Sequence, residues 1–343
     1  GAGGQLDLGL IQQRELAVLE GPAQAALNEK TLDRAGVHVG PEELEVVPAV
    51  GLGVIHGRVG VLEHRVGGGP VVGINADADA QRHVELVAAR RRGIPVMHRS
   101  DLLADLMRLK PHAVAVGGTH GKTTTTSMIS AIVDAANIGA TSIVGGILHR
   151  SGTNARWGTG DCLVAEADEH DGSFLRLHPT IAVVTSIDAE HLEYYGTLDR
   201  IQRAFIDFCN AVPFYGYSVL CADDPNIAAI LSEIESLRVT YGLGDGVSLQ
   251  AVNVAVETDE HASSFTERLG NCRVGFDVIS HDERLRQTGM LGRLRLKTLG
   301  THNIRNALAA CAVGLCLGLR FGQIAEGLRA FDGVRRRLQV CGE

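Results

Sequence analysis

The sequence is poor in aromatic residues and has no excess of positive charge. Phe, Trp and Tyr make up 4% of the 343 residues, whereas glycine occurs 42 times and hydrophobic residues reach 45%. This composition is typical of a globular α/β protein with many turns and excludes a disordered chain. The net charge of -8 excludes an overall positive field for nucleic acid or an anionic membrane. Any phosphate partner must therefore be bound by local groups.

The sequence also lacks a cysteine framework and a long apolar run. The seven cysteines are odd in number and include no C-x-x-C pair, which favours core thiols in a reducing cytosol over disulfides. No apolar run approaches the roughly 18 residues that suggest a membrane span, and the first residues lack a basic segment followed by an apolar core. We therefore expect a cytoplasmic protein with neither a nucleic-acid nor a membrane partner.

The chain length exceeds the usual single-domain size of roughly 100 to 200 residues, which predicts two domains. Residues 1–72 are rich in Gly and Val and show no convincing amphipathic helix. Beyond them the pattern predicts a helix at 84–92, a short strand at 93–98 and a helix at 100–109 with Ser100 as its N-cap. This alternation indicates an α/β layer.

A strand, a glycine-rich loop and a helix are expected next, at 112–118 and 123–136. The helix is indicated by apolar residues at helical spacing: Met128, Ile129, Ile132, Val133 and Ala136. Strands predicted at 162–168 and 180–188 both end in acidic residues. Carboxylates should therefore stand at the carboxyl edge of a mainly parallel sheet, where ligands of such sheets bind. Later elements are expected in this order: a strand at 217–224, a helix at 226–234, a strand at 237–242, a variable stretch through Gly292, and a helix from Thr301.

The segment GGTHGKTTTT, Gly117 to Thr126, carries the strongest chemical signal. Its glycines let backbone N–H groups turn toward phosphates, Lys122 adds a positive charge at the β and γ phosphates, and the following helix adds its N-terminal dipole. The strict pattern G-x-x-x-x-G-K-[ST] fails by one place, because position 116 is Val116. A glycine turn that happens to carry Lys-Thr is the alternative, but the strand before it and the helix after it favour phosphate binding.

A magnesium site is expected beside this loop. Thr123 can place its hydroxyl on the ion, and Glu166 or Asp168 can supply a carboxylate from a neighbouring strand end. The alternative is a solvated acidic loop, which is the fate of most acidic clusters. His191 is a weaker candidate by its chemistry alone, because magnesium prefers oxygen and a lone histidine is more often structural.

Several segments together resemble the Mur ligase family. They follow one another in the family's order over about residues 84–343: GTHGKTTT, EADEHDGSFL, SIDAEHLEYYG, GTHNIRNALAA and FDGVRRR. Within the family, the histidine of THGK and the stretch DGSFLRLHP resemble the ligases that join L-alanine to UDP-N-acetylmuramate. The ligases that recycle murein tripeptide also carry THGK and stay an alternative.

The resemblance implies a P-loop central domain with a mainly parallel sheet flanked by helices, preceded by a smaller Rossmann-like α/β domain. The boundaries expected from it are an N-terminal UDP-substrate-binding domain at 1–108, atypical over 1–72, and an ATP-binding domain at 109–332. Residues 333–343 would begin a C-terminal domain that this chain lacks, so the sequence looks truncated.

The resemblance also implies roles for individual residues. Lys122, Glu166 and His191 would be catalytic, and magnesium would lie among Thr123, Glu166 and His191. ATP would contact two sets of residues, around the phosphates and near the adenine: Gly118, Thr119, His120, Gly121, Lys122, Thr123 and Thr124; His302, Asn303, Asn306, Arg336 and Arg337. Asn154 and Arg156 would face the muramyl substrate. Without the resemblance, the late residues predict only a helix N-cap, surface polar groups and a solvated arginine run, and Asn154 and Arg156 only a polar turn.

The implied activity is ATP- and magnesium-dependent joining of L-alanine to UDP-N-acetylmuramate through an acyl phosphate, in peptidoglycan synthesis. A nucleotide-binding fragment without ligase turnover is the rival hypothesis. A P-loop kinase or GTPase is a third, opposed by the absence of a clear N-K-x-D tetrapeptide in the sequence. Whether the chain forms a homodimer is left open.

Overall fold

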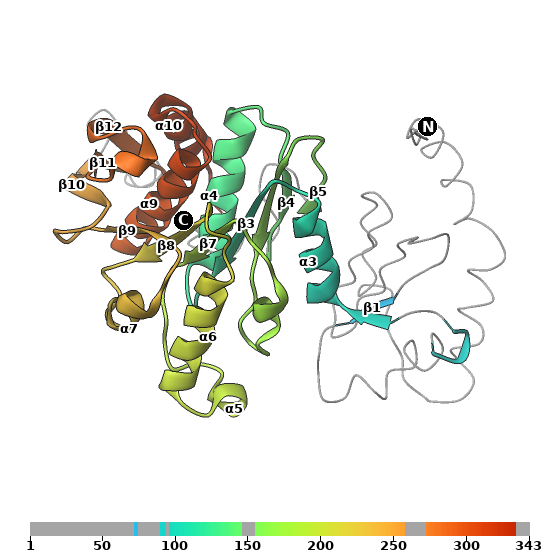
Figure 1. The fold of residues 1–343 in the computed structure, drawn as a ribbon. Coiled ribbons are helices and arrows are strands. Elements are labelled where there is room, and N and C mark those ends of the chain that lie inside the picture. Colours follow the sequence, from blue (N-terminus) through green and yellow to red (C-terminus); the bar gives the residue numbers. More distant parts are fainter. Residues whose placement is uncertain (1–71, 75–89, 94–95, 146–154, 258–271, 334–343) are drawn as a thin grey trace, which may run out of the picture. The chain divides into compact units, whose positions relative to one another are not determined.

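A ten-stranded sheet organises the part of the chain that this computed structural model describes, namely residues 72–74, 90–93, 96–145, 155–257 and 272–333 (Figure 1). The strands from β10 to β4 run parallel, and β5, β11 and β12 are antiparallel to their neighbours. Across the sheet, the order is β12 (Gly289–Leu296), β11 (Arg273–Ser280), β10 (Leu249–Glu257), β9 (Leu237–Gly242), β8 (Tyr217–Cys221), β7 (Ile181–Val184), β3 (His112–Gly117), β6 (Cys162–Glu166), β4 (Thr141–Ile143) and β5 (Ala155–Arg156). A separate parallel pair joins β1 (Val72–Ile74) to β2 (Val96–His98).

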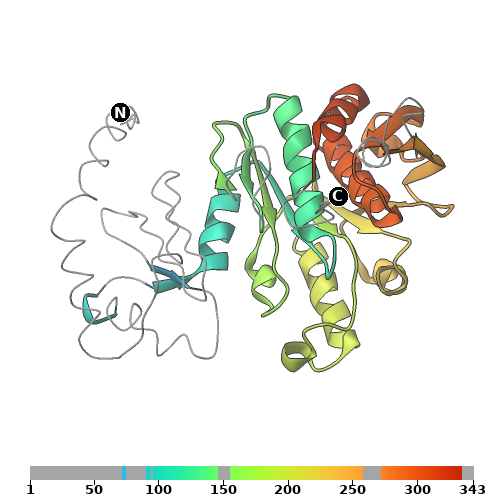
Figure 2. The ribbon, with the colours of Figure 1, turned by 180° about the vertical axis from the view of Figure 1, so that it is seen from behind.

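Helices cover the sheet on both faces (Figures 1 and 2). On one face α4 (Lys122–Ala135) packs against α9 (Thr301–Cys316) and α10 (Phe321–Ala330). On the other, Phe205 and Phe208 of α6 (Leu198–Asn210) pack with Phe174 of η3 (Ser173–Arg176). The remaining helical segments are α3 (Arg99–Arg108), α5 (Leu192–Tyr195), α7 (Pro225–Ile230), η4 (Leu231–Glu233) and η5 (Glu283–Leu285). The central strands are thus buried from both sides, as in doubly wound sheets.

Helix α4 forms although its sequence, KTTTTSMISAIVDA, is rich in hydroxyl residues that are weak helix formers. The hydroxyls of Thr126, Ser127 and Ser130 each donate to the backbone carbonyl four residues earlier, at 2.7–2.9 Å. These bonds satisfy polar groups that are buried against α9 and α10. The polar first turns of α4 can therefore be buried in the core directly after the phosphate loop.

The predicted α/β class and the mainly parallel sheet are confirmed. The strands expected at 112–118, 162–168, 180–188, 217–224 and 237–242 correspond to β3, β6, β7, β8 and β9. The helices expected after the loop, at 226–234 and from Thr301 correspond to α4, to α7 with η4, and to α9. The arginines 90–92 are exposed. Residues 1–71, and with them most of the expected Rossmann-like domain, lie outside the described residues.

The N-cap prediction for α3 was wrong. The helix begins at Arg99, so His98 is the N-cap, and its Nδ1 accepts from the Ser100 N–H at 3.2 Å. The Asp101 carboxylate accepts from the His98 N–H at 3.2 Å, which completes a reciprocal capping box. Ser100 is instead the second helical residue. An imidazole nitrogen of His98 therefore caps the helix, where the sequence pattern predicted a serine hydroxyl.

The described cysteines are free thiols, as predicted from their number and spacing. Burial raises the pKa of Cys162, Cys209 and Cys311 to about 12 each, so these thiols stay protonated and inert. Among the described residues, no helix is both long and apolar enough to cross a membrane.

Candidate functional site

The loop between β3 and α4 has a backbone that only glycine adopts readily. Gly118 has a φ of +123° and Gly121, the N-cap of α4, has a φ of +86°. As glycine, the N-cap has no side chain that could accept a hydrogen bond from the first-turn amides of α4. Free N–H groups at a helix N-terminus, next to a glycine loop, form an anion-binding surface.

The segment that follows β7 fixes this loop in place. Ser186 accepts from the loop twice, its carbonyl from the Thr119 N–H and its hydroxyl from the His120 N–H, both at 2.9 Å. The Thr185 hydroxyl lies 3.2 Å from the Gly117 carbonyl and 2.5 Å from the His120 carbonyl. The loop is therefore held by hydrogen bonds to the segment that follows β7. The sequence analysis did not identify Thr185 or Ser186.

Lys122 forms an ion pair with a buried carboxylate. Its ammonium donates to Glu169 Oε1 at 2.8 Å and to the Gly118 carbonyl at 2.7 Å. Glu169 is only 2% exposed, and its Oε2 has no hydrogen-bond partner among the described residues. Burial raises the pKa of Glu169, and the nearby Lys122 opposes that rise. The Lys122 side chain thus folds back over the loop that precedes it and pairs with Glu169, a carboxylate that the sequence did not indicate.

Thr123 and Glu166 lie together, as the sequence predicted. The Thr123 hydroxyl donates to Glu166 Oε1 at 3.2 Å, and Glu166 Oε2 accepts from the Gly145 N–H at 2.8 Å. Their proximity follows from the sheet register, because Val116, the last residue but one of β3, pairs with Glu166 at the end of β6. Asp168, the other carboxylate candidate, is exposed and accepts from the His170 N–H at 3.2 Å.

His191 contacts a different group of residues. Its Nδ1 lies 2.8 Å from His170 Nδ1 and 3.6 Å from a Glu193 carboxylate oxygen. Among the described interactions, none joins His191 to Thr123 or to Glu166. The structure therefore brings together two of the three residues predicted to surround magnesium.

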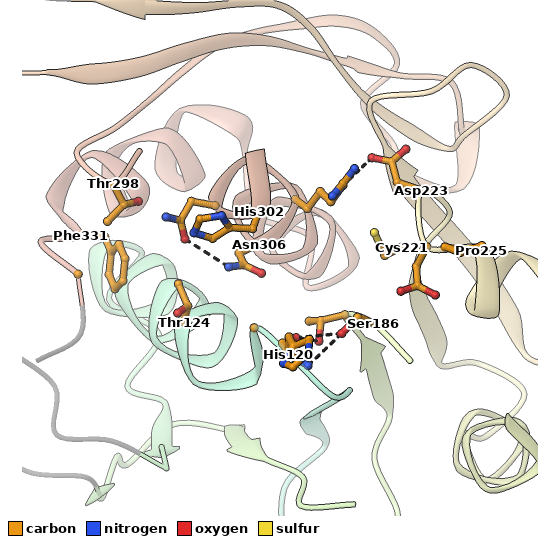
Figure 3. Close-up of a pocket in the computed structure, with 16 residues that line it drawn as sticks. His120, Thr124, Ser186, Cys221, Asp223, Pro225, Thr298, His302, Asn306 and Phe331 are labelled. Carbon is orange, nitrogen blue, oxygen red and sulfur yellow. Dashed lines mark hydrogen bonds and ion pairs between the residues drawn. The ribbon is translucent and has the colours of Figure 1, made fainter. Parts of the chain in front are cut away.

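A cavity of about 530 Å³ opens beside the loop (Figure 3). It is lined by His120, Gly121 and Thr124 from the loop and α4, by His302, Asn303 and Asn306 of α9, and by residues after β7 and β8. The volume lies within the range of small-molecule sites, roughly 300–1,000 Å³. Of the predicted residues, this cavity brings together His120, Gly121 and Thr124 from the phosphate set and His302, Asn303 and Asn306 from the adenine set, whereas Gly118, Thr119, Lys122 and Thr123 do not line it.

Asn306 links α9 to the first turn of α4, directly after the phosphate loop. Its side-chain oxygen accepts from the buried Thr125 hydroxyl at 3.2 Å, and its amide donates to Asn303 at 3.3 Å. A Cβ at Gly121 would lie 2.6 Å from the same oxygen. Glycine is therefore required at position 121 for two reasons, its positive φ and this close approach.

An ion pair that the sequence analysis missed lies at the far side of the cavity. Arg305 Nε donates to Asp223 Oδ2 at 2.8 Å, and Asp223 also accepts from the N–H groups of Leu243 and Gly244. Burial alone would raise the pKa of Asp223, but the bonds from Arg305 and these amides lower it overall. The signal available in the sequence was the acidic end of the predicted strand at 217–224.

The predicted muramyl and arginine residues are not part of this cavity as the structure describes it. Arg156, on the edge strand β5, forms an ion pair with Asp134 of α4. Asn154, Arg336 and Arg337 lie outside the described residues.

Comparison with known proteins gives consistent matches. Residues 116–314 match the family described as the Mur ligase middle domain. A UDP-N-acetylmuramate–L-alanine ligase of Myxococcus xanthus is 46% identical over 259 residues, which is 76% of this chain and 51% of that protein. The chain spans about half the length of the first curated relatives it matches.

Two solved structures are similar in fold. The UDP-N-acetylmuramate–alanine ligase of Thermotoga maritima superposes with a TM-score of 0.64 and 27% identity, covering 79% of this chain and 57% of that one. A UDP-N-acetylmuramate:L-alanyl-gamma-D-glutamyl-meso-diaminopimelate ligase from Neisseria meningitides gives a TM-score of 0.63 at 24% identity, covering 78% and 80%. The second likeness supports the fold alone.

Proposed function

The chain belongs to the Mur ligase family, and from that premise we propose that it carries the ATP-binding part of a ligase that joins L-alanine to UDP-N-acetylmuramate. The proposal rests most directly on one observation. His120 and Gly121 of the glycine loop and Asn306 of α9 line a single cavity of about 530 Å³, and Lys122 follows Gly121 directly in the chain. Two relatives that are 46% identical to this chain are UDP-N-acetylmuramate–L-alanine ligases, which favours L-alanine over murein tripeptide as the substrate.

We place ATP with its phosphates on the loop and its base toward α9. The amides at the start of α4 would bind phosphate oxygens, and Gly118 and Gly121 let the backbone approach closely. Lys122 would leave Glu169 and turn to the phosphates, which carry more charge than one carboxylate. Asn303 and Asn306 would then bound the base.

Magnesium fits the donor set between α4 and β6. A hydroxyl and a carboxylate, from Thr123 and Glu166, lie 3.2 Å apart at the loop, and hard oxygen donors are what this ion prefers. When bound, magnesium would offset phosphate charge during transfer. The resemblance to the family also implies His191 as a magnesium ligand. To bind this ion, His191 would have to reorient its side chain or use the ring nitrogen that does not face His170.

In the proposed reaction, the carboxylate of UDP-N-acetylmuramate attacks the γ-phosphorus and ADP leaves. The L-alanine amine then attacks the acyl carbon, phosphate leaves, and the nitrogen loses a proton. The protein's contribution is to position the reactants and to stabilise charge through Lys122 and the loop amides.

We propose the domain boundaries given above, with the ATP-binding domain at 109–332. We also propose a cytoplasmic location, with which the free thiols are consistent.

The test is ADP release by the purified chain with magnesium-ATP, after adding UDP-N-acetylmuramate and then L-alanine. We expect release only when both are present. Release that requires the tripeptide in place of L-alanine would identify the recycling activity instead. Bound ATP with no release under any condition would leave a nucleotide-binding fragment, the rival hypothesis.

A further inference from the structure

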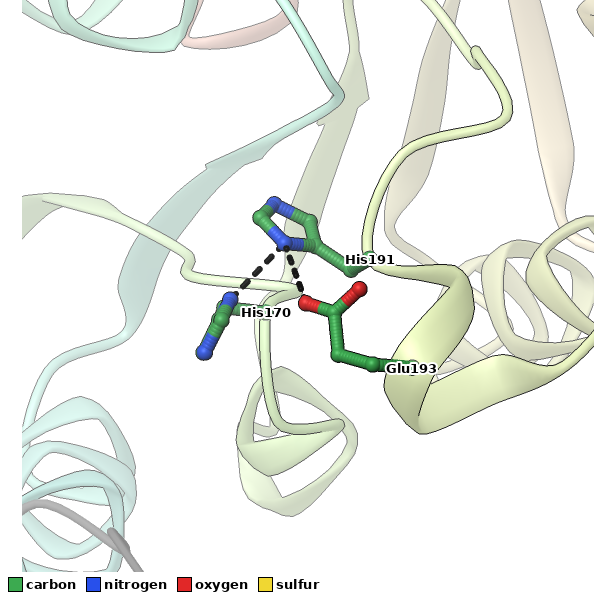
Figure 4. Close-up of side chains that lie close together, drawn as sticks. All are labelled: His170, His191 and Glu193. Carbon is green, nitrogen blue, oxygen red and sulfur yellow. Dashed lines mark hydrogen bonds and ion pairs between the residues drawn. The ribbon is translucent and has the colours of Figure 1, made fainter.

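Three side chains that could share a metal ion lie close together (Figure 4). His170 comes from the loop after β6, and His191 and Glu193 come from the start of α5. One ring nitrogen of each histidine and one carboxylate oxygen all lie within 4.8 Å of one another. The two Nδ1 atoms are 2.8 Å apart, and His191 Nδ1 is 3.6 Å from Glu193 Oε1.

These separations suit a small tetrahedral ion. Zinc–nitrogen bonds of about 2.0–2.1 Å place neighbouring ligand atoms roughly 3.3 Å apart. The distance from His191 to Glu193 is already close to that value. The two imidazoles, now joined by a hydrogen bond, would need to separate by about half an ångström, and both side chains are accessible enough to do so.

The backbone that carries the cluster is braced. The Tyr195 hydroxyl, in α5, donates to the Glu169 carbonyl at 2.6 Å, next to His170 in the chain. Tyr194 packs on Gly172 so closely that a Cβ there would lie 2.5 Å from its hydroxyl. His191 itself has a φ of +55°, an uncommon conformation for a residue with a side chain. The two loops are therefore held together by contacts that involve none of the three metal-binding atoms.

We propose that His170, His191 and Glu193 bind a borderline divalent metal of the Zn²⁺ or Co²⁺ type, at a site that shares only His191 with the magnesium set proposed above. Two imidazoles and one carboxylate are a donor set that zinc uses, with the fourth position left open to water. Magnesium avoids such nitrogen-rich sets. Because His191 is common to this cluster and to the family's magnesium ligands, the bound ion controls which way the imidazole of His191 points.

The experiment is a titration of the metal-free chain with Co²⁺, followed in the visible d–d absorption of tetrahedral cobalt, and then displacement by Zn²⁺. No nucleotide or substrate is present, so the outcome does not depend on ligase activity. We expect saturable binding that excess Mg²⁺ does not displace. His170→Ala and Glu193→Gln should each weaken Co²⁺ binding by at least tenfold, since each removes a direct ligand.

His178→Ala is the matched control, because it removes an exposed histidine outside the cluster. It should bind Co²⁺ as tightly as the wild type. The substituted residues His170 and Glu193 are exposed, and an unchanged unfolding midpoint would show that the folds of the variants are intact. Absence of the tetrahedral band in the wild type would overturn the proposal, and so would equal Co²⁺ affinity in His170→Ala and wild type.

Discussion

Replacing Gly118 with alanine should destabilise the protein more than an ordinary glycine substitution. The φ of +123° at this position is disfavoured for any residue with a side chain. A Cβ would also lie 2.3 Å from Thr185 Oγ1, 2.9 Å from Thr185 N and 3.0 Å from Ser186 N. The neighbours are thus a backbone segment and a hydroxyl, neither of which is the free end of a flexible side chain.

The expected loss has two parts. The backbone conformation costs about 1–3 kcal/mol. The crowding costs about 1–3 kcal/mol more, because the backbone must shift to make room. The Thr185 hydroxyl cannot rotate away freely, since it is bonded to the Gly117 and His120 carbonyls. The free energy of unfolding should therefore fall by about 2–6 kcal/mol in Gly118→Ala.

Gly246→Ala separates the two parts. Gly246 has a φ of +78°, and a Cβ there would meet nothing within 4 Å, so only the conformational cost of about 1–2 kcal/mol applies. The assay is urea unfolding of both variants, comparing midpoints at an unchanged m value. Equal losses in the two variants would refute the claim that the segment after β7 fixes the phosphate loop.

Three further substitutions test the site. Glu166→Gln should raise the magnesium concentration needed for half-maximal ATP binding, and a superimposable magnesium titration would remove Glu166 from the metal site. Glu169→Gln should change the pH dependence of stability. Burial raises the pKa of Glu169 against the pull of Lys122, so the folded chain holds this proton more tightly than the unfolded chain. The contribution of Glu169 to the free energy of unfolding therefore falls as the pH rises from 4.5, the ordinary pKa of a glutamate, through the raised pKa of the folded chain. Unfolding curves of the variant across this pH range should lack that fall. Asn306→Ala leaves the buried Thr125 hydroxyl without its acceptor and should cost about 1–3 kcal/mol in urea unfolding; a loss near zero would mean that this bond does not join α9 to α4.

The phosphate loop could be predicted from sequence because its determinants are local. Glycines, Lys122 and Thr123 lie within a few residues of one another, between an apolar strand and a helix of clear periodicity. Glu166 could be placed because parallel strands bring their carboxyl ends to one edge, and β6 indeed pairs with β3. Each of these inferences needed only the chain direction and the type of residue.

The contacts that hold the loop could not be predicted in the same way. Thr185 and Ser186 lie more than 60 residues from the loop, and their role depends on β7 being the neighbour of β3. The sequence alone does not distinguish Glu169 from the other acids of its acidic run, because its burial depends on the fold. The strand β10 could not be predicted because its residues from Asn253 to Val256 are exposed and a bulge between Val252 and Ala255 interrupts its alternation.

The most direct test of the central claim is equilibrium binding of magnesium-ATP to the wild type and to the double variant Lys122→Met with Glu169→Gln. The pair of changes removes the loop cation without leaving the buried carboxylate unpaired, so the fold should persist, as an unfolding curve would verify. We expect saturable binding by the wild type that the double variant loses. Equal affinity in two folded proteins would contradict the assignment of this loop as the ATP site.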